Sequence, residues 1–178
     1  YDPEVANSGI DFLTRLLPKY HPFLFALTTP PQEASQAPSS SGGDLPRPSV
    51  LEAVLNFTLL SLRGPEPLPL RSASQFWVNV LTLPSDGGSI QTAIMQCLPA
   101  LCRILISQVA GRCARSDLEH LCEVLRKLIF KQQGAARPHL AAALDDLGSN
   151  GTSNQHQGAS TSPEDRQRFL ASLLAARG

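Results

Sequence analysis

The sequence carries no excess of charge of either sign. Fifteen Lys and Arg residues balance fifteen Asp and Glu residues among its 178 positions, and the basic residues form no block. Nucleic acids and anionic membranes attract proteins through clustered positive charge. The composition therefore gives no reason to expect either of them as a partner.

The sequence also lacks the local motifs of common catalytic sites. It contains no GxSxG, HExxH or GxGxxG pattern and no Walker loop. The acidic pair Asp145 and Asp146 lies near an expected helix end, where it is more typical of a solvated face than of a catalytic carboxylate dyad. We therefore expect neither an enzyme nor a bound cofactor.

The cysteines and histidines do not suggest a metal site. The four cysteines have no CxxC spacing. Cys97 and Cys102 would lie about 140° apart around a helix, so they cannot converge on one metal ion. His120 and Cys122 also fall on different sides of a helix. We expect reduced, mostly buried thiols and no metal.

No segment is expected to be a signal peptide or a membrane span. Acidic residues interrupt the first segment. The longest apolar run, at about residues 94–110, is broken by polar residues and by Pro99, which favours a buried helix over a span. The chain begins with Tyr1 and contains a single methionine, Met95. We therefore expect a piece of a longer polypeptide.

Helical signals run through the rest of the chain, and no segment alternates with the period of a strand. Asp2 precedes Pro3, a favourable helix start, and this helix should reach about Lys19, with 21–27 as an extension or a short separate helix. Helix-starting serines with a glutamate three positions on stand at two places, Ser49 with Glu52 and Ser116 with Glu119. The segment from Ser162 to Asp165 is a further helix start with an acidic first turn.

Two segments rich in Pro, Ser and Gly separate the helical stretches. Residues 30–48 have low apolar content and predict a flexible insertion. Residues 148–162 predict a linker, which follows a short helix expected over residues 136–147.

The helices from Leu70 to about Gly111 are the most informative part of the chain. In the first of them, Phe76 and Trp77 face inward together with Ala73 and Val80. The second, which begins at Ser89, is apolar nearly all round and needs neighbours on more than one side. A stacked helical array supplies such neighbours.

The helix pairs recur at a regular pitch. Leading helices are expected to begin near residues 3, 70, 116 and 163. The last two intervals are about 46 and 47 residues, and the first falls to about 47 without the insertion, a period typical of HEAT and armadillo repeats. We therefore expect an all-α protein, an α-α superhelix of about three helix pairs plus a terminal helix. Residues 1–178 would form one HEAT-repeat solenoid.

Two motifs resemble a known family. The segment RSASQFW at residues 71–77, after a Leu-Pro corner, resembles the C-terminal HEAT repeats of the importin-β superfamily, or karyopherins, in the branch of importin-thirteen and transportin-three. The segment SPEDRQRF at residues 162–169 is similar to the start of the terminal helix in that branch. Both motifs are structural and not catalytic.

The resemblance implies the C-terminal portion of a nuclear transport receptor that shuttles between nucleus and cytoplasm. This portion would contribute to the recognition of protein cargo. The Ran GTPase would bind upstream repeats, outside this chain, and grooves between helices could also take Phe-Gly nucleoporins. A non-transport helical scaffold, part of a larger assembly, is the alternative.

In this family the second helix of each pair lines the concave face that holds cargo. The resemblance thus nominates polar residues of two such helices as protein-binding residues, with a merely solvated surface as the alternative. They are Gln96, Arg103, Ser107, Gln108, Arg112, Asp145 and Asp146. For Arg71 we expect hydrogen bonds to carbonyl groups of a neighbouring repeat in preference to a cargo contact.

Overall fold

The computed structural model describes residues 2–27, 49–84, 88–150 and 162–175. Within these residues the chain forms six α-helices and no strand, which confirms the expected all-α repeat array. The helices are α1 (Pro3–Ala26), α2 (Val50–Arg63), α3 (Pro67–Thr82), α4 (Ser89–Ser107), α5 (Leu118–Asn150) and α6 (Pro163–Ala175).

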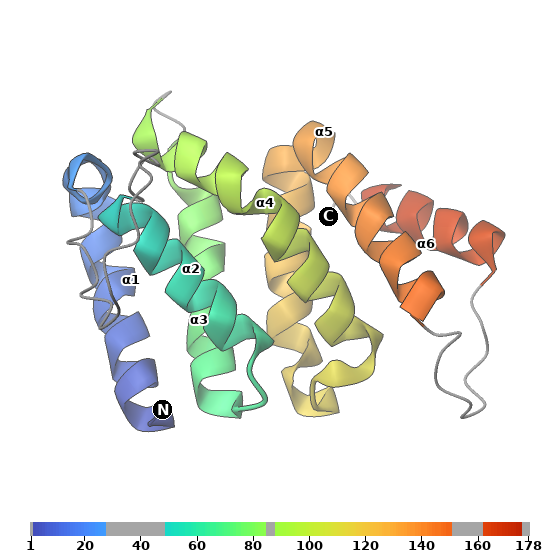
Figure 1. The fold of residues 1–178 in the computed structure, drawn as a ribbon, viewed down its shortest axis with the longest axis horizontal. Helices are drawn as coiled ribbons and strands as arrows, with labels where there is room; N and C mark the ends of the chain where they lie inside the picture. Colours follow the sequence, from blue (N-terminus) through green and yellow to red (C-terminus); the bar gives the residue numbers. More distant parts are fainter. Residues whose placement is uncertain (1, 28–48, 85–87, 151–161, 176–178) are drawn as a thin grey trace, which may run out of the picture.

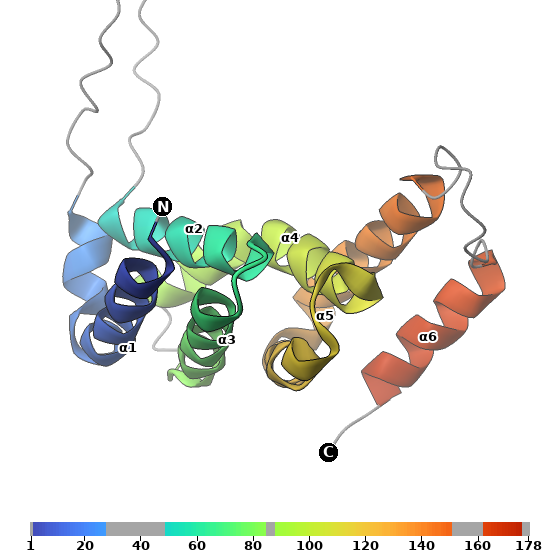
Figure 2. The same ribbon diagram turned by 90° about the horizontal axis from the view of Figure 1, so that it is seen from below.

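The helices stack in two rows (Figures 1 and 2). We call α1, α3 and the first half of α5 the first row. The second row consists of α2, α4 and the second half of α5. Each helix packs against the next one in its own row. Between the rows, α2 packs against α1 and α3, and α4 packs against α1 and α5, while α6 packs on α5. The rows therefore correspond to the first and second helices of successive pairs.

α1 and α2 begin with the caps that the sequence predicts. The Asp2 side chain accepts a hydrogen bond from the Glu4 backbone N–H. Ser49 and Glu52 form the expected reciprocal capping box, which satisfies two backbone donors at the start of α2. α1 is one continuous helix through Pro18 and Pro22, so the apolar segment after Lys19 extends it.

The expected insertion at residues 30–48 lies outside the described residues, but its flanks are described. The backbone N–H of Val50 donates to the carbonyl oxygen of Leu27 over 2.8 Å. The end of α1 and the start of α2 are therefore side by side, and α2 can pack on α1 whatever the length of the chain between them.

α3 forms the middle of the core. It begins at Pro67, three positions before the predicted start, and it buries Ala73, Phe76, Trp77 and Val80 as expected. The rings of Phe76 and Trp77 meet edge to face, with centroids 6.2 Å apart. Both side chains are fully buried, so this aromatic pair fills the space between helices and is not an exposed anchor.

α4 continues through Pro99 and then widens into a π-helical segment, Gln108–Arg112. The φ of Gly111 is +120°, a conformation that costs a glycine little and other residues much more. By length and composition alone, Ile90–Arg112 is apolar enough to cross a membrane, so its polar residues do not by themselves exclude a span. About 50% of its most apolar stretch is buried inside the protein, as in the core helix of an array.

The start of α5 differs from the prediction. Ser116 does not cap a helix; it lies in a 3₁₀ turn, Arg115–Asp117, and α5 begins at Leu118. Further on, Gln132 has non-helical φ and ψ of −130° and 30°. This kink divides α5 into its two halves, close to residue 136, where the sequence predicts that a separate short helix begins.

The end of α5 also corrects the expected linker. Gly148 belongs to α5, which reaches Asn150, and Ser162 caps α6 by accepting from the Asp165 backbone N–H. The predicted linker therefore began too early, at residue 148, whereas the predicted helix start at Ser162 is confirmed. Residues 151–161 lie outside the described residues.

Each row has one hydrogen bond that joins residues one repeat apart. In the first row Arg71 Nε donates to Asp117 Oδ1 over 2.7 Å, and near the second row Gln108 Nε2 donates to the Leu62 carbonyl oxygen over 2.8 Å. Both pairs are 46 positions apart. Arg71 thus reaches the neighbouring repeat as predicted, but its acceptor is a carboxylate and not a carbonyl.

The Arg71–Asp117 ion pair gives a test of the fold. The Asp117 side chain is 3% exposed and the Arg71 side chain is 44% exposed. Arg71→Met leaves a buried carboxylate without its partner and should lower the free energy of unfolding by about 3 kcal/mol. Asp117→Asn should cost only about 1 kcal/mol, because Arg71 can turn to water.

Urea unfolding followed by circular dichroism measures both changes. Arg126→Met is the matched control, since the Arg126–Glu123 pair is exposed, and it should leave the unfolding midpoint in place. Equal losses for Arg71→Met and Arg126→Met would contradict the structural role of the Arg71 pair.

Candidate protein-binding site

A hollow of about 330 Å³ opens where α4 meets the second half of α5. All three helices of the second row contribute to its wall. The lining residues are Arg63 from α2, Arg103, Ile104 and Ser107 from α4, Gln108 and Arg112 from the π segment, and Ala143, Asp146 and Leu147 from α5. We refer to it as the arginine hollow.

The arginine hollow brings together five of the seven residues that the sequence nominates. They are Arg103, Ser107, Gln108, Arg112 and Asp146. Gln96 is exposed on α4 but does not line the hollow. Asp145, although next to Asp146, lies in a second groove between α5 and α6.

Arg63 lines the hollow but was not nominated. It is the last residue of α2, the second helix of the first pair, so the rule that selected residues of α4 applied to it equally. The signal was available: Leu62, the preceding residue, is one repeat before Gln108.

The hollow has an excess of positive charge. Three arginines line it against one carboxylate, that of Asp146. Arg103 Nε lies 3.3 Å from Asp146 Oδ2, with the two side chains 71% and 54% exposed, so this pair is worth little. Arg63 and Arg112 have no ion-pair partner within the described part of the chain.

Gln108 anchors the floor of the hollow. It is 4% exposed, and its bond to the Leu62 carbonyl ties the π segment to the end of α2. Its Oε1 atom is buried and finds no hydrogen-bond donor among the described residues. A buried acceptor without a donor lowers the free energy of unfolding.

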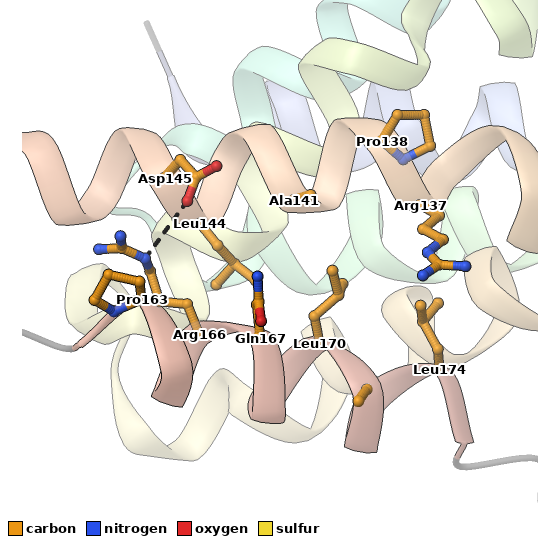
Figure 3. Close-up of a pocket in the computed structure, with 11 residues that line it drawn as sticks. Arg137, Pro138, Ala141, Leu144, Asp145, Pro163, Arg166, Gln167, Leu170 and Leu174 are labelled. Atoms are coloured by element: carbon orange, nitrogen blue, oxygen red, sulfur yellow. Dashed lines mark ion pairs between the residues drawn. The ribbon is translucent and has the colours of Figure 1, made fainter.

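The second groove, about 720 Å³, lies between α5 and α6 (Figure 3). Leu144, Leu170 and Leu174 point into the space between the two helices, and an ion pair of 3.5 Å joins Asp145 to Arg166 at one end. No residue of α6 is fully buried. The groove therefore reflects the loose seating of α6 on α5.

The remaining reactive side chains form no further site. No group of three or more potential metal ligands occurs among the described residues. Cys97 and Cys102 are buried, whereas Cys113 is half-buried and Cys122 is exposed, so fewer thiols are buried than expected. Burial, with a smaller contribution from Glu52, raises the pKa of the Cys97 thiol to about 11. Burial raises the pKa of Cys102 to about 12.

The two-row stack defines an α-helical repeat protein, and the arginine hollow lies on its second row. Residues 62–133 match the family described as Importin 13 repeat. This part of the chain is an importin-13-like repeat region of the importin-β family. No curated protein and no solved structure matches the chain.

Thiol reactivity tests the packing of α4. At about pH 8, iodoacetamide should modify Cys122 first and spare Cys97 and Cys102, since the raised pKa values keep both buried thiols protonated. Peptide mapping by mass spectrometry locates the label, and the same reaction in urea should modify all of them. Labelling of Cys97 as fast in the folded protein as in urea would show that α4 is not packed as described.

Proposed function

We propose that this chain is part of a nuclear transport receptor and supplies a protein-binding surface for cargo recognition. The supporting observation is where the family match falls. Residues 62–133 comprise α3, α4 and the first half of α5, and four of the five nominated residues in the arginine hollow belong to this range. The residues that match the transport family thus include most of the nominated residues of the candidate surface.

The proposed role is binding and not catalysis. Receptors of this family act by holding other proteins, and the arginine hollow offers charged and polar contacts on the second row of helices. The partners proposed for the receptor are protein cargo at this surface, the Ran GTPase at upstream repeats, and Phe-Gly nucleoporins. The proposed location is both nucleus and cytoplasm.

An exposed apolar stripe on α1 supports a longer solenoid. Val5, Phe12 and Phe23 are all largely exposed, and spacings of seven and eleven residues place them on one side of the helix. Ile10 and Leu17 are buried on another side, against the array. We infer that a further helix pair covers this stripe, so that residues 1–178 are one segment of a single HEAT-repeat array.

Capture of the receptor from cells tests the proposal. The receptor that contains this chain, tagged and captured with its bound proteins, should exchange them when Ran carrying a non-hydrolysable GTP analogue is added. Release of bound proteins would indicate import, and recruitment of new ones would indicate export. Ran carrying GDP is the control and should change nothing.

Retention of the same proteins with both forms of Ran would contradict a transport role. That result would favour the alternative, a helical scaffold in a larger assembly. Fluorescent tagging adds a second readout, since a shuttling receptor is expected on both sides of the nuclear envelope.

A further inference from the structure

We propose that the arginine hollow binds an acidic segment of a partner protein. This inference deepens the proposed function and rests on it for the nature of the partner. The whole chain is neutral, so long-range attraction of acidic proteins is not expected. The excess positive charge is local, because Arg63, Arg103 and Arg112 share a hollow with the single carboxylate of Asp146.

The arginines come from segments that are fixed relative to one another. Arg63 follows Leu62, whose carbonyl accepts the hydrogen bond from Gln108, and Gln108 begins the π segment that ends with Arg112. The positive φ of Gly111 shapes the backbone just before Arg112. Arg63 and Arg112 thus converge on one hollow through a buried hydrogen bond, which reduces the cost of ordering them on binding.

Guanidinium groups favour carboxylates as ligands. An arginine presents a planar fork of donors that matches the two oxygens of a carboxylate. Arg63 and Arg112 have no carboxylate partner within the described residues. Arg103 has only its exposed, 3.3 Å contact with Asp146, which an incoming carboxylate can replace at little cost.

The lining favours a protein over a nucleic acid. Single-stranded nucleic acids bind through aromatic side chains that stack on bases as well as through positive charge, and no aromatic residue lines this hollow. Its apolar lining consists of Ile104, Ala143 and Leu147. About 330 Å³ is the small end of ligand pockets, which suits a few side chains of an extended peptide.

Fluorescence anisotropy with a model peptide tests this inference on the purified chain. The probe is a short fluorescein-labelled peptide of alternating glutamate and glycine. The double variant Arg63→Gln/Arg112→Gln should weaken binding by about tenfold or more, because it removes two charge-assisted contacts. The control Arg15→Gln/Lys19→Gln removes the same charge from exposed positions on α1 and should change the affinity less than about twofold. Circular dichroism verifies that each variant is folded.

A second pair of variants tests whether removing negative charge from the hollow raises its affinity for the acidic peptide. Asp146→Asn frees Arg103 and should tighten binding of the acidic peptide. Asp145→Asn makes the same charge change one position away, in the groove with Arg166, and should leave the affinity nearly unchanged. A structure-independent charge effect would instead raise the affinity equally in both variants, and that result would overturn the proposal.

Other outcomes separate this inference from the proposed function. Unchanged peptide binding by Arg63→Gln/Arg112→Gln would refute the hollow, as would tighter binding of a short oligouridylate than of the acidic peptide. If the receptor still exchanges its partners with Ran in either case, the transport role stands without the hollow. If the peptide binds as expected but Ran has no effect, the hollow stands and the transport role fails.

Discussion

The structure depends on the packing of each helix pair against the next pair. α4 is less apolar all round than its sequence indicates, because Thr92, Gln96 and Arg103 lie on an exposed stripe. Its buried side packs against α1, α2 and α5. Apolar packing does not by itself fix how far one pair slides along another. The Arg71–Asp117 and Gln108–Leu62 hydrogen bonds, one at each row and both spanning 46 residues, fix this offset because each must satisfy a buried polar group.

The same offset assembles the arginine hollow. Gln108 joins the π segment to the end of α2, and this contact brings Arg63 and Arg112 from consecutive pairs to one place. The kink at Gln132 redirects the second half of α5, so that Asp146 completes the wall. Stability and surface chemistry are thus divided between the rows. Phe76 and Trp77 fill the core between them, whereas Arg63 and Arg112 of the second row have no ion-pair partner among the described residues.

Local signals in the sequence predicted most of the helices, and long-range contacts account for the errors. The Ser49–Glu52 capping box depends only on residues three positions apart. Ser116 has the same pattern, but Asp117 is held by Arg71 from the preceding pair, and the chain forms a 3₁₀ turn there. Gly148 remains helical, and the end of the Arg166 side chain from α6 lies against it, a contact that the local sequence does not indicate. For the site, the order of the helices predicted that the nominated residues lie on the second row. It did not predict which groove each residue lines. Asp146 lines the arginine hollow and Asp145 lines the groove between α5 and α6, because the kink in α5 sets the direction of its second half.

The loose seating of α6 makes the stability of the array uneven along its length. The central helices are held by many fully buried side chains, whereas α6 has none and relies on half-buried leucines, the Asp145–Arg166 pair and a 3.4 Å hydrogen bond from Gln133 to the Leu174 carbonyl oxygen. In a repeat array each unit is stabilised by its immediate neighbours, and α6 has a neighbour on one side only among the described helices. Its detachment therefore costs only part of the global free energy of unfolding. We therefore expect α6 to detach under conditions that leave the buried Phe76–Trp77 centre folded.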